Sequence, residues 1–440
     1  MTAGLLEAAL GEARRGGAEQ AEAYFMESAS DSVDFENNRL AGIDSSSSRG
    51  IGIRVFLDNR IGFASTSALD ELPATVAAAR DTARLTRREP AELRLPAGPS
   101  ITAGISDPEV EAMDLADFLE MGRAALGRLT PLADGVLAGA GAGRSVATVA
   151  IANTNGLTSH CRRSGWYFSA VAQRVEGTSV LWCHDGSSSR HRDLDVDETI
   201  ENVATKVRQS LREGRLGTGA RPVVFTPAAV SALLSSLHSG VAAPAVHRGT
   251  SPLAGRLGER VLNPMVTITD DLRPEAGRAG MPFDDEGIPA AELPLIEAGV
   301  LKNFVADLRF AARLGCPPGR GRRGGYASAP APAAGNWLMS PGEQPLASLL
   351  ERASGGLMVD SLLGMHGSNL ANGDFSASVG LGFALGPGGE ILYRVKDAAV
   401  AGNFYQLFGE DLVGLSVERR RTYSGSALLP WALAARVAVT

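Results

Sequence analysis

Residues 55–63 have the sequence Val-Phe-Leu-Asp-Asn-Arg-Ile-Gly-Phe. Apolar residues flank the Asp-Asn pair on both sides, and such a pair is typical of the tight turn of a β-hairpin. The stretch therefore predicts two antiparallel strands joined by a two-residue turn. Apolar and polar residues alternate over residues 20–67, where we expect four or five short strands. The serine run at residues 45–48 is expected to form a loop or the end of a strand.

The regions beside these strands show helical periodicity. Leu5, Leu6, Ala9 and Leu10 recur at helical spacing and predict an N-terminal helix. Further elements are expected in this half of the chain: helices over residues 71–88, 115–129 and 196–212, strands over 136–140, 145–153, 158–175 (with an internal break) and 178–183, and a proline-rich connector over 89–110. Together they predict an α/β domain with antiparallel strands and flanking helices over residues 1–212.

The second half of the chain has a different pattern. Residues 213–220 are glycine-rich and aperiodic, so we predict a linker there. Residues 221–440 contain many short β-like segments between glycines and prolines, which predicts a β-rich C-terminal domain and an α+β fold for the chain. Residues 315–335 are rich in glycine, arginine, alanine and proline, and we expect a long mobile loop. Whether that loop gates a cleft is left open.

Composition and charge exclude several classes of protein. The chain of 440 residues carries a formal net charge of −7 and lacks the basic footprint of nucleic-acid-binding proteins. Its three cysteines, Cys161, Cys183 and Cys316, cannot form a disulfide framework, which favours a reducing compartment. No apolar run reaches the roughly 18 residues of a membrane span, and the N-terminal segment lacks a basic signal-peptide region. We therefore expect a cytoplasmic protein without nucleic-acid or membrane partners.

Several longer segments carry information beyond their secondary structure. Residues 226–240 have the sequence Thr-Pro-Ala-Ala-Val-Ser-Ala-Leu-Leu-Ser-Ser-Leu-His-Ser-Gly, in which Thr226 suits a helix N-cap and Pro227 the first helical position. Residues 249–259 are Gly-Thr-Ser-Pro-Leu-Ala-Gly-Arg-Leu-Gly-Glu. Residues 284–289 are Asp-Asp-Glu-Gly-Ile-Pro, and residues 295–304 are Leu-Ile-Glu-Ala-Gly-Val-Leu-Lys-Asn-Phe.

Shorter segments accompany them in a fixed order along the chain. They are Ala-Glu-Ala-Tyr at 21–24, Gly-Ile-Gly-Ile-Arg-Val at 50–55, Arg-Gly-Gly-Tyr at 323–326, Gly-Asp-Phe-Ser at 373–376 and Gly-Asn-Phe at 402–404. Taken together and in this order, the segments resemble the TldD/PmbA family. The resemblance implies an α/β N-terminal domain followed by a β-rich C-terminal domain.

The resemblance also locates a metal motif that this chain does not contain. Peptidases of the family carry His-Glu-x-x-x-His as zinc ligands and general base. When the motif is aligned on the four residues that follow it, Gly255, Arg256, Gly258 and Glu259, its three key positions fall on Leu234, Ser235 and Ser239. None of these side chains can bind zinc or act as a carboxylate base. The family's third zinc ligand, a cysteine near the C-terminus of TldD, is also missing, because no cysteine follows residue 407.

The chain therefore resembles the TldE (PmbA) half of the family. This implies a non-catalytic subunit of a TldD/TldE-type zinc metallopeptidase that processes unfolded or leader peptides, with a role in forming the peptide-binding chamber. We expect no catalytic residue and no metal in this chain, and zinc in a TldD-type partner that carries His-Glu-x-x-x-His. Two alternatives stay open: a homodimeric peptide-binding or scaffold protein, and a natural-product biosynthesis protein that recruited the fold.

One polar stretch is a candidate for binding peptide. Residues 364–376 place five polar side chains in a glycine-rich segment, namely His366, Ser368, Asn369, Asp374 and Ser376. By resemblance the segment lies near the peptide cleft or the subunit interface, where its side chains could hydrogen-bond a peptide backbone or supply a base. The alternative is a polar turn held by its own Asn and Asp side chains.

The histidines and cysteines offer two further candidate metal sites. His238 and His247 lie near the absent motif, and His160-Cys161 and Cys183-His184 could meet on neighbouring strands. Isolated helical ligands without a base rarely form a zinc site, which disfavours His238 and His247. Adjacent strand residues point to opposite faces, so the two Cys-His pairs supply only two ligands. For those pairs we favour two buried cysteines and two exposed histidines, or the reverse.

The remaining charged and glycine-rich segments have ordinary explanations. Arg320, Arg322 and Arg323 could clamp a carboxylate, but a solvated loop is favoured. Residues 284–286 could attract a cation, but an exposed acidic turn is expected. Residues 139–144, Gly-Ala-Gly-Ala-Gly-Arg, lack the spacing of a phosphate-binding loop.

Overall fold

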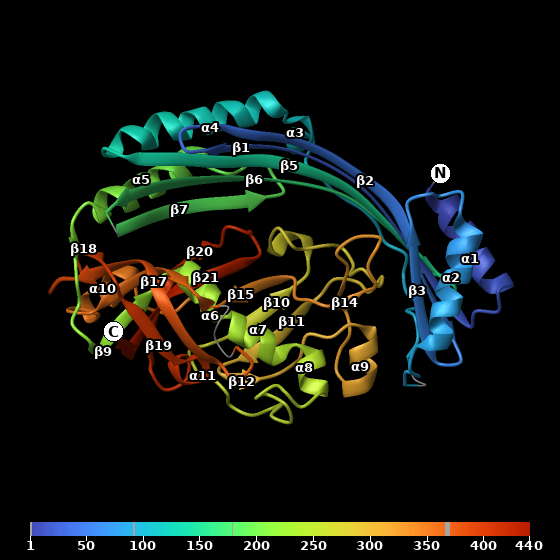
Figure 1. The fold of residues 1–440 in the computed structure, drawn as a ribbon. Helices are drawn as coiled ribbons and strands as arrows, with labels where there is room; N and C mark the ends of the chain where they lie inside the picture. The colour runs from blue at the N-terminus through green and yellow to red at the C-terminus, as the bar shows by residue number, and fades with distance from the viewer. Residues whose placement is uncertain (1, 91–92, 178, 366–369) are drawn as a thin grey trace.

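Two large β-sheets, each with its own helices, form the protein (Figure 1). The computed structural model describes residues 2–90, 93–177, 179–365 and 370–440. The chain is a mixed α+β protein with predominantly antiparallel sheets and a β-rich second half, as predicted.

The first sheet has the strand order β3-β2-β1-β5-β6-β4, with β7 also paired to β6. Its strands are β1 Gln20–Glu36, β2 Arg39–Leu57, β3 Arg60–Thr66, β4 Thr102–Ile105, β5 Val136–Asn153, β6 Thr158–Glu176 and β7 Ser179–Ser189. All pairs are antiparallel except β4 with β6. The sheet is long and curved, and its helices cover one face at each end (Figure 1).

The predicted hairpin at residues 55–63 is confirmed, because β2 and β3 are joined by Asp58 and Asn59 with φ of 53° and 54°. The prediction of four or five short strands over residues 20–67 is wrong, since two long strands, β1 and β2, and the shorter β3 occupy this region. The serine run lies in the middle of β2, where Ser45 pairs with Asp31 and Ser48 with Ser28. Both faces of this part of β2 are exposed, so its side chains lack the alternation that marks a half-buried strand.

Two other predicted interruptions are also absent. Residues 136–153 form the single strand β5, and β6 runs through the expected break without a change of register. The expected connector at 89–110 contains the short strand β4 and the start of a helix. Glycines and alanines at residues 138–143 weakened the strand signal, although the paired backbone continues through them.

Two groups of helices cover the first sheet. At one end lie α1 Thr2–Arg15 and α2 Leu72–Leu85, and at the other lie α3 Pro108–Ala112, α4 Leu115–Leu129 with the 3-10 turn Thr130–Leu132, and α5 Val196–Ser210. Helix α4 begins with the capping box of Asp114 and Asp117 and spans the predicted residues. Helices α4 and α5 pack Phe118 and Val203 into a core with Trp166 and Phe168 of β6. The opposite face of β5, β6 and β7 is therefore turned away from these helices.

The second sheet has the order β12-β11-β10-β15-β21-β9-β16-β17-β18-β8, with β19 paired to β17 and β21, and β20 to β21. Its strands are β8 Glu213–Gly214, β9 Gly219–Phe225, β10 Ile268–Asp271, β11 Glu292–Glu297, β12 Val300–Leu301, β15 Asn336–Met339, β16 Leu357–Leu363, β17 Asp374–Leu385, β18 Ile391–Val395, β19 Ala399–Asn403, β20 Leu412–Arg421 and β21 Ala427–Val439. A separate pair is formed by β13 Gly321–Arg322 and β14 Ala331–Pro332. Strand β21 pairs with β9, β15, β19 and β20 and so joins these four strands within the sheet.

Short helices accompany the second sheet. They are α6 Pro227–Leu233, α7 Ser235–Val241, α8 Ala243–His247, the 3-10 turn Pro274–Ala276, α9 Leu308–Leu314, α10 Leu346–Arg352 and α11 Phe404–Leu407. Strand β8 and the first residues of β9 lie within residues 213–220, and the domain division proposed around this segment stays a prediction. Among the described residues, no helix is both long and apolar enough to cross a membrane.

Candidate functional site

Helices α6 and α7 carry the positions of the metal motif. As predicted, Thr226 caps α6 by accepting a hydrogen bond from the Ala229 N–H, and Pro227 opens the helix. Leu234 joins the two helices with a helical backbone, so the three motif positions lie on one nearly continuous helical stretch. The local backbone therefore suits a helical metal motif, and the side chains decide its chemistry.

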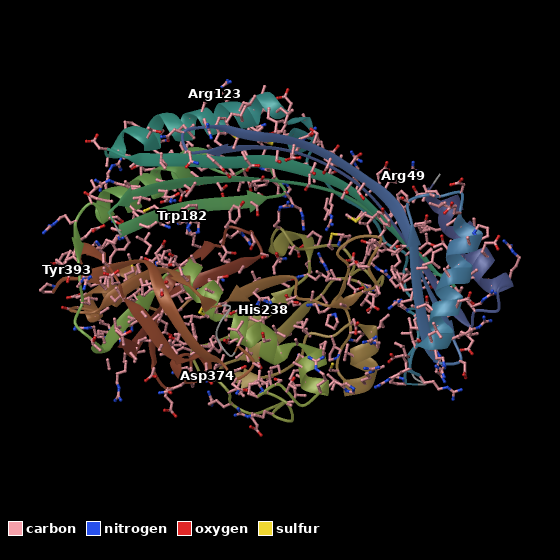
Figure 2. All side chains as sticks on the ribbon, viewed as in Figure 1. Arg49, Arg123, Trp182, His238, Asp374 and Tyr393 are labelled. Carbon is pink, nitrogen blue, oxygen red and sulfur yellow. The ribbon has the colours of Figure 1, made fainter. Side chains whose placement is uncertain are left out.

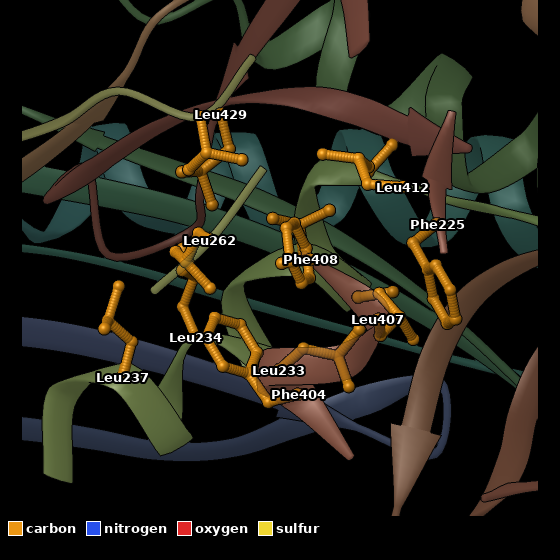
Figure 3. Packing of buried hydrophobic residues seen from close by; sticks show 14 of the residues in the cluster. Phe225, Leu233, Leu234, Leu237, Leu262, Phe404, Leu407, Phe408, Leu412 and Leu429 are labelled. Carbon is orange, nitrogen blue, oxygen red and sulfur yellow. The ribbon is translucent and has the colours of Figure 1, made fainter. Parts of the chain in front are cut away.

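The side chains at the three motif positions do not fit zinc. Leu234 is 2% exposed and belongs to the core cluster that contains Leu262, Phe404 and Phe408 (Figure 3). Both serines bond within their own helical stretch: Ser235 donates from Oγ to the Ala232 carbonyl (2.6 Å) and Ser239 to the Ser235 carbonyl (3.1 Å). Zinc is held by Cys, His, Asp or Glu, and the described residues contain no group of three or more such side chains able to hold a metal ion.

The other candidate metal ligands lie in separate environments. His238, labelled in Figure 2, stacks on Trp337 with ring centroids 3.7 Å apart. His247 contacts Phe310 edge-on, with ring centroids 5.9 Å apart. On β6 and β7, His184 pairs with Val171 and not with the half of the strand that holds Cys161. Cys161 and Cys183 are buried, His184 is exposed and His160 is half-buried, so the first of the two arrangements expected from sequence is met in part.

The polar stretch 364–376 is described in part. His366, Ser368 and Asn369 lie outside the described residues. Asp374 is exposed at the start of β17 and accepts a hydrogen bond from Asn403 Nδ2 (2.8 Å), and Ser376 is exposed two residues further along the strand. Asn403, at the end of β19, also donates to the Asn372 carbonyl, so a side chain of the neighbouring strand holds the start of β17. A role of this stretch in a cleft or interface stays a prediction.

Tyr405 brings the motif helix and this stretch together. A Cβ atom at Gly373 would lie 2.7 Å from the Tyr405 ring, and one at Gly240 would overlap the Tyr405 hydroxyl. That hydroxyl has no hydrogen-bond partner in the described part of the chain, and burial raises its pKa to about 12. The buried Ser236 Oγ and Trp337 Nε1 also lack partners among the described residues. The sequence analysis did not predict this grouping. Its one signal in the sequence was the two glycines, Gly240 and Gly373, which have no side chain where the Tyr405 side chain lies.

The acidic turn at residues 284–286 is buried, which corrects the prediction of an exposed turn. Asp284 accepts hydrogen bonds from the N–H groups of Glu286, Ile288 and Gly321 at 2.9–3.0 Å. Burial, reinforced by the charge of Glu286, raises the pKa of Asp284 well above its ordinary value. Glu286 in turn forms an ion pair with Arg54 of β2 (2.7 Å).

Residues 315–335 are likewise anchored and not the expected mobile loop. Arg320 is 2% exposed and pairs with Asp270, and Arg323 pairs with Glu22 of β1. Glu22 also pairs with Arg54 at 2.8 Å. Of the arginines that were expected to be solvated, Arg323 therefore ties the second half of the chain to the first sheet, whereas Arg320 forms its ion pair within the second half. Charged side chains are buried when they are paired, and here the pairing overrides a local sequence pattern typical of a loop.

Comparisons with known proteins identify the family. Residues 21–83 match the PmbA/TldA metallopeptidase domain 1, and residues 218–440 match the PmbA/TldA metallopeptidase C-terminal domain. These matches cover more than half of the chain. The chain belongs to the TldD/PmbA family.

Individual TldD/PmbA proteins resemble the chain over nearly its full length. It is 27% identical to the metalloprotease PmbA of Escherichia coli O157:H7, across 91% of this chain and 88% of that protein. Its fold matches TldE from Thermococcus kodakarensis with a TM-score of 0.87 at 22% identity, covering 99% of this chain and 100% of the other. It also matches a putative modulator of DNA gyrase from Thermotoga maritima with a TM-score of 0.86 at 24% identity, covering 100% of both chains.

In this TldD/PmbA chain a cavity of about 530 Å³ opens on the face of the first sheet that is turned away from α4 and α5. We call it the sheet groove; it is lined by residues 34–37, 137–141, 169–171, Gln173, Trp182, His184, Asp185 and Tyr423. Trp182 is 48% exposed there (Figure 2). Asp34 and Glu36 form an acidic end, where burial and the charges of Glu36 and Asp44 raise the pKa of Asp34. The glycines at 139, 141 and 143 belong to the segment weighed above as a phosphate loop and lie on one face of β5. Those at 139 and 141 line the sheet groove and place no side chain in it.

Proposed function

We propose that the chain is a non-catalytic, TldE/PmbA-like subunit of a TldD/TldE-type zinc metallopeptidase that processes unfolded or leader peptides. One observation carries the proposal: in a metallopeptidase family, the motif positions hold a core leucine, Leu234, and two serines whose hydroxyls bond within their own helical stretch. A general base and metal ligands would then have to come from another chain. A TldD-type paralogue with His-Glu-x-x-x-His is the partner that supplies them.

The chain's own contribution is to shape the chamber and to hold peptide. Residues 39–50 of β2 pair with β1 on one side, whereas β3 pairs only with residues 51–57. Among the described residues this leaves a free edge, which can bind an extended peptide through backbone hydrogen bonds that tolerate varied sequences. The sheet groove offers a second surface, lined by both apolar and polar side chains, with an acidic end. Zinc in the partner would activate the attacking water, and both chains would act in the cytoplasm.

Reconstitution tests the proposal. The purified chain, a TldD-type paralogue carrying His-Glu-x-x-x-His, and their mixture are each assayed on a fluorogenic unfolded peptide. We expect no cleavage by this chain alone and cleavage by the mixture that is lost when the glutamate of the partner's motif is replaced by glutamine. Cleavage by the isolated chain would contradict the proposal. Failure of every paralogue to bind, together with a stable self-dimer, would favour the homodimeric scaffold instead.

A further inference from the structure

Three arginines meet where residues 274–283 rest on the open face of the first sheet. The guanidinium of Arg278 lies flat on Gly165 of β6, since a Cβ atom there would overlap it. Arg163 precedes Gly165 by two residues, so it lies on the same face of the strand, and its Nη1 contacts Met281 Sδ at 3.1 Å. Arg190, just after β7, donates to the carbonyl oxygens of Pro274 and Arg278 at 2.9 Å and to that of Gly280.

These three positive charges have no carboxylate partner among the described residues. Arg54, Arg320 and Arg323, by contrast, each pair with a buried carboxylate. Burial, followed by the charges of Arg163 and Arg278, lowers the pKa of Arg190 to about 10. Burial and Arg163 likewise lower the pKa of Arg278. The protein therefore gathers like charges in a poorly hydrated place, which costs free energy unless an anion compensates them.

A cavity of about 410 Å³ opens beside two of these arginines. We call it the arginine cavity; its lining includes Ser187, Ser188, Arg190, Arg278, Arg420 and Arg421. The Arg278 guanidinium has no hydrogen-bond acceptor in the described part of the chain. The Ser188 hydroxyl, on the same wall, is buried and also lacks a partner among the described residues. The unused N–H donors of the Arg278 guanidinium and the unused Ser188 hydroxyl can donate hydrogen bonds to the two oxygens of a carboxylate.

The same lining also contains four acidic residues, Asp193, Asp195, Glu198 and Glu275. Asp195 caps α5 by accepting from the Glu198 N–H at 2.8 Å, and Glu275 lies 3.5 Å from Arg273. The charge of Asp193 raises the pKa of Arg421, but burial lowers this pKa by more. Arg421 itself donates to the Ala276 carbonyl. None of the four carboxylates forms an ion pair with Arg190 or Arg278 among the described residues.

The arginine cavity adjoins the sheet groove. Tyr423 lines the groove and rests on Gly186, which lines the arginine cavity. Along β6, Ser169 of the groove and Gly165 under Arg278 are four residues apart, or about 13 Å at ~3.3 Å per residue. The two cavities together have an acidic end at Asp34 and Glu36 and a basic end at the arginines. An extended peptide of about four residues spans such a length.

We propose that Arg163, Arg190 and Arg278, with the Ser188 hydroxyl, form a subsite for a peptide carboxylate, and that the peptide's amine end lies toward Asp34 and Glu36. The assignment of a peptide as ligand rests on the proposed function, whereas the anion-binding chemistry follows from the arginines themselves. The subsite gives this subunit a way to hold short peptides by their free C-terminus, in one direction along the first sheet.

Calorimetric titration of the full chain at low salt tests the subsite. The probes are tetra-alanine with a free carboxylate, the same peptide as its C-terminal amide, and inorganic phosphate. Arg278→Gln removes the free guanidinium, and Ser188→Ala removes the free hydroxyl with little risk to folding. Arg248→Gln is the matched control, because Arg248 is exposed and forms no ion pair among the described residues. Thermal unfolding of each variant verifies that it folds.

We expect the free acid to bind about tenfold tighter than the amide, and Arg278→Gln to abolish that preference. Ser188→Ala should weaken binding of the acid, while Arg248→Gln should leave the preference unchanged. Equal affinity of the acid and the amide would overturn the proposal, as would a preference that survives in Arg278→Gln. Phosphate binding without peptide binding would assign the arginines to a different anion. Because these titrations use the isolated chain, their failure is separate from failure to restore cleavage with a partner.

Discussion

Single residues in this chain depend on partners that are distant in sequence. Arg54 and Glu286 are separated by 232 positions, and Glu22 and Arg323 by 301. No local pattern can reveal such a pairing, which is why residues 284–286 were expected to be exposed and residues 320–323 to be solvated. The loss of metal ligands at Leu234, by contrast, was visible in the sequence, because it concerns side-chain identity and not contact.

Arg54 is the residue on which the buried ionic network depends most. It is 4% exposed and pairs with Glu22 and Glu286, both fully buried. Arg54→Leu should lower the free energy of unfolding by about 3–5 kcal/mol at pH 7, because the buried Glu286 loses its counter-charge and the buried Glu22 keeps only that of Arg323. Urea unfolding measures the change.

A surface pair provides the control for this substitution. Arg88→Gln breaks the exposed pair with Asp58 and should cost less than about 1 kcal/mol. The Arg54→Leu deficit should shrink as the pH falls toward about 4, since protonated carboxyls no longer need a counter-charge. A deficit below 1 kcal/mol at pH 7 would show that the network contributes little to stability.

At the scale of elements, local sequence signals were sufficient to predict a helix or a turn where its capping or turn residues are strongly favoured. Helix α4 spans the predicted residues because Asp114 and Asp117 form a capping box, and the turn at Asp58 and Asn59 has the backbone that such residues favour. Strand β2 was missed in its first half because polar side chains lie on both of its faces. The grouping of Tyr405 with Gly240 and Gly373 was missed because it joins elements from distant parts of the chain.

Hydrogen exchange should separate strand from loop at the two segments where the prediction was wrong. Within residues 39–50 about half of the amides point to β1 and should exchange slowly, because the edge strand is paired on one side only. Amides at residues 321 and 323 should also be protected, since they donate to Asp284 and Asp285. Peptide-level mass spectrometry measures both segments, and complete exchange within seconds at either one would indicate a mobile loop.

At the scale of the whole molecule, the order of the family segments predicted the α+β fold and the family, and both are confirmed. The division at residues 213–220 stays a prediction. The sequence could not show that the two halves are tied by buried ion pairs, nor that a groove and an arginine-lined cavity adjoin beneath the first sheet. Both features arise where residues of the C-terminal half meet β6 and β7, so they depend on the assembled fold.

The central claim is that this subunit carries no catalytic zinc, and the most direct test is the zinc content of the isolated chain. The chain is purified without a metal-affinity column, dialysed against a zinc-containing buffer and then against a metal-free one, and analysed by mass spectrometry of the elements. The account predicts less than about a tenth of a zinc ion per chain, because Leu234, Ser235 and Ser239 supply no ligand set. One zinc ion per chain, retained after dialysis, would contradict it.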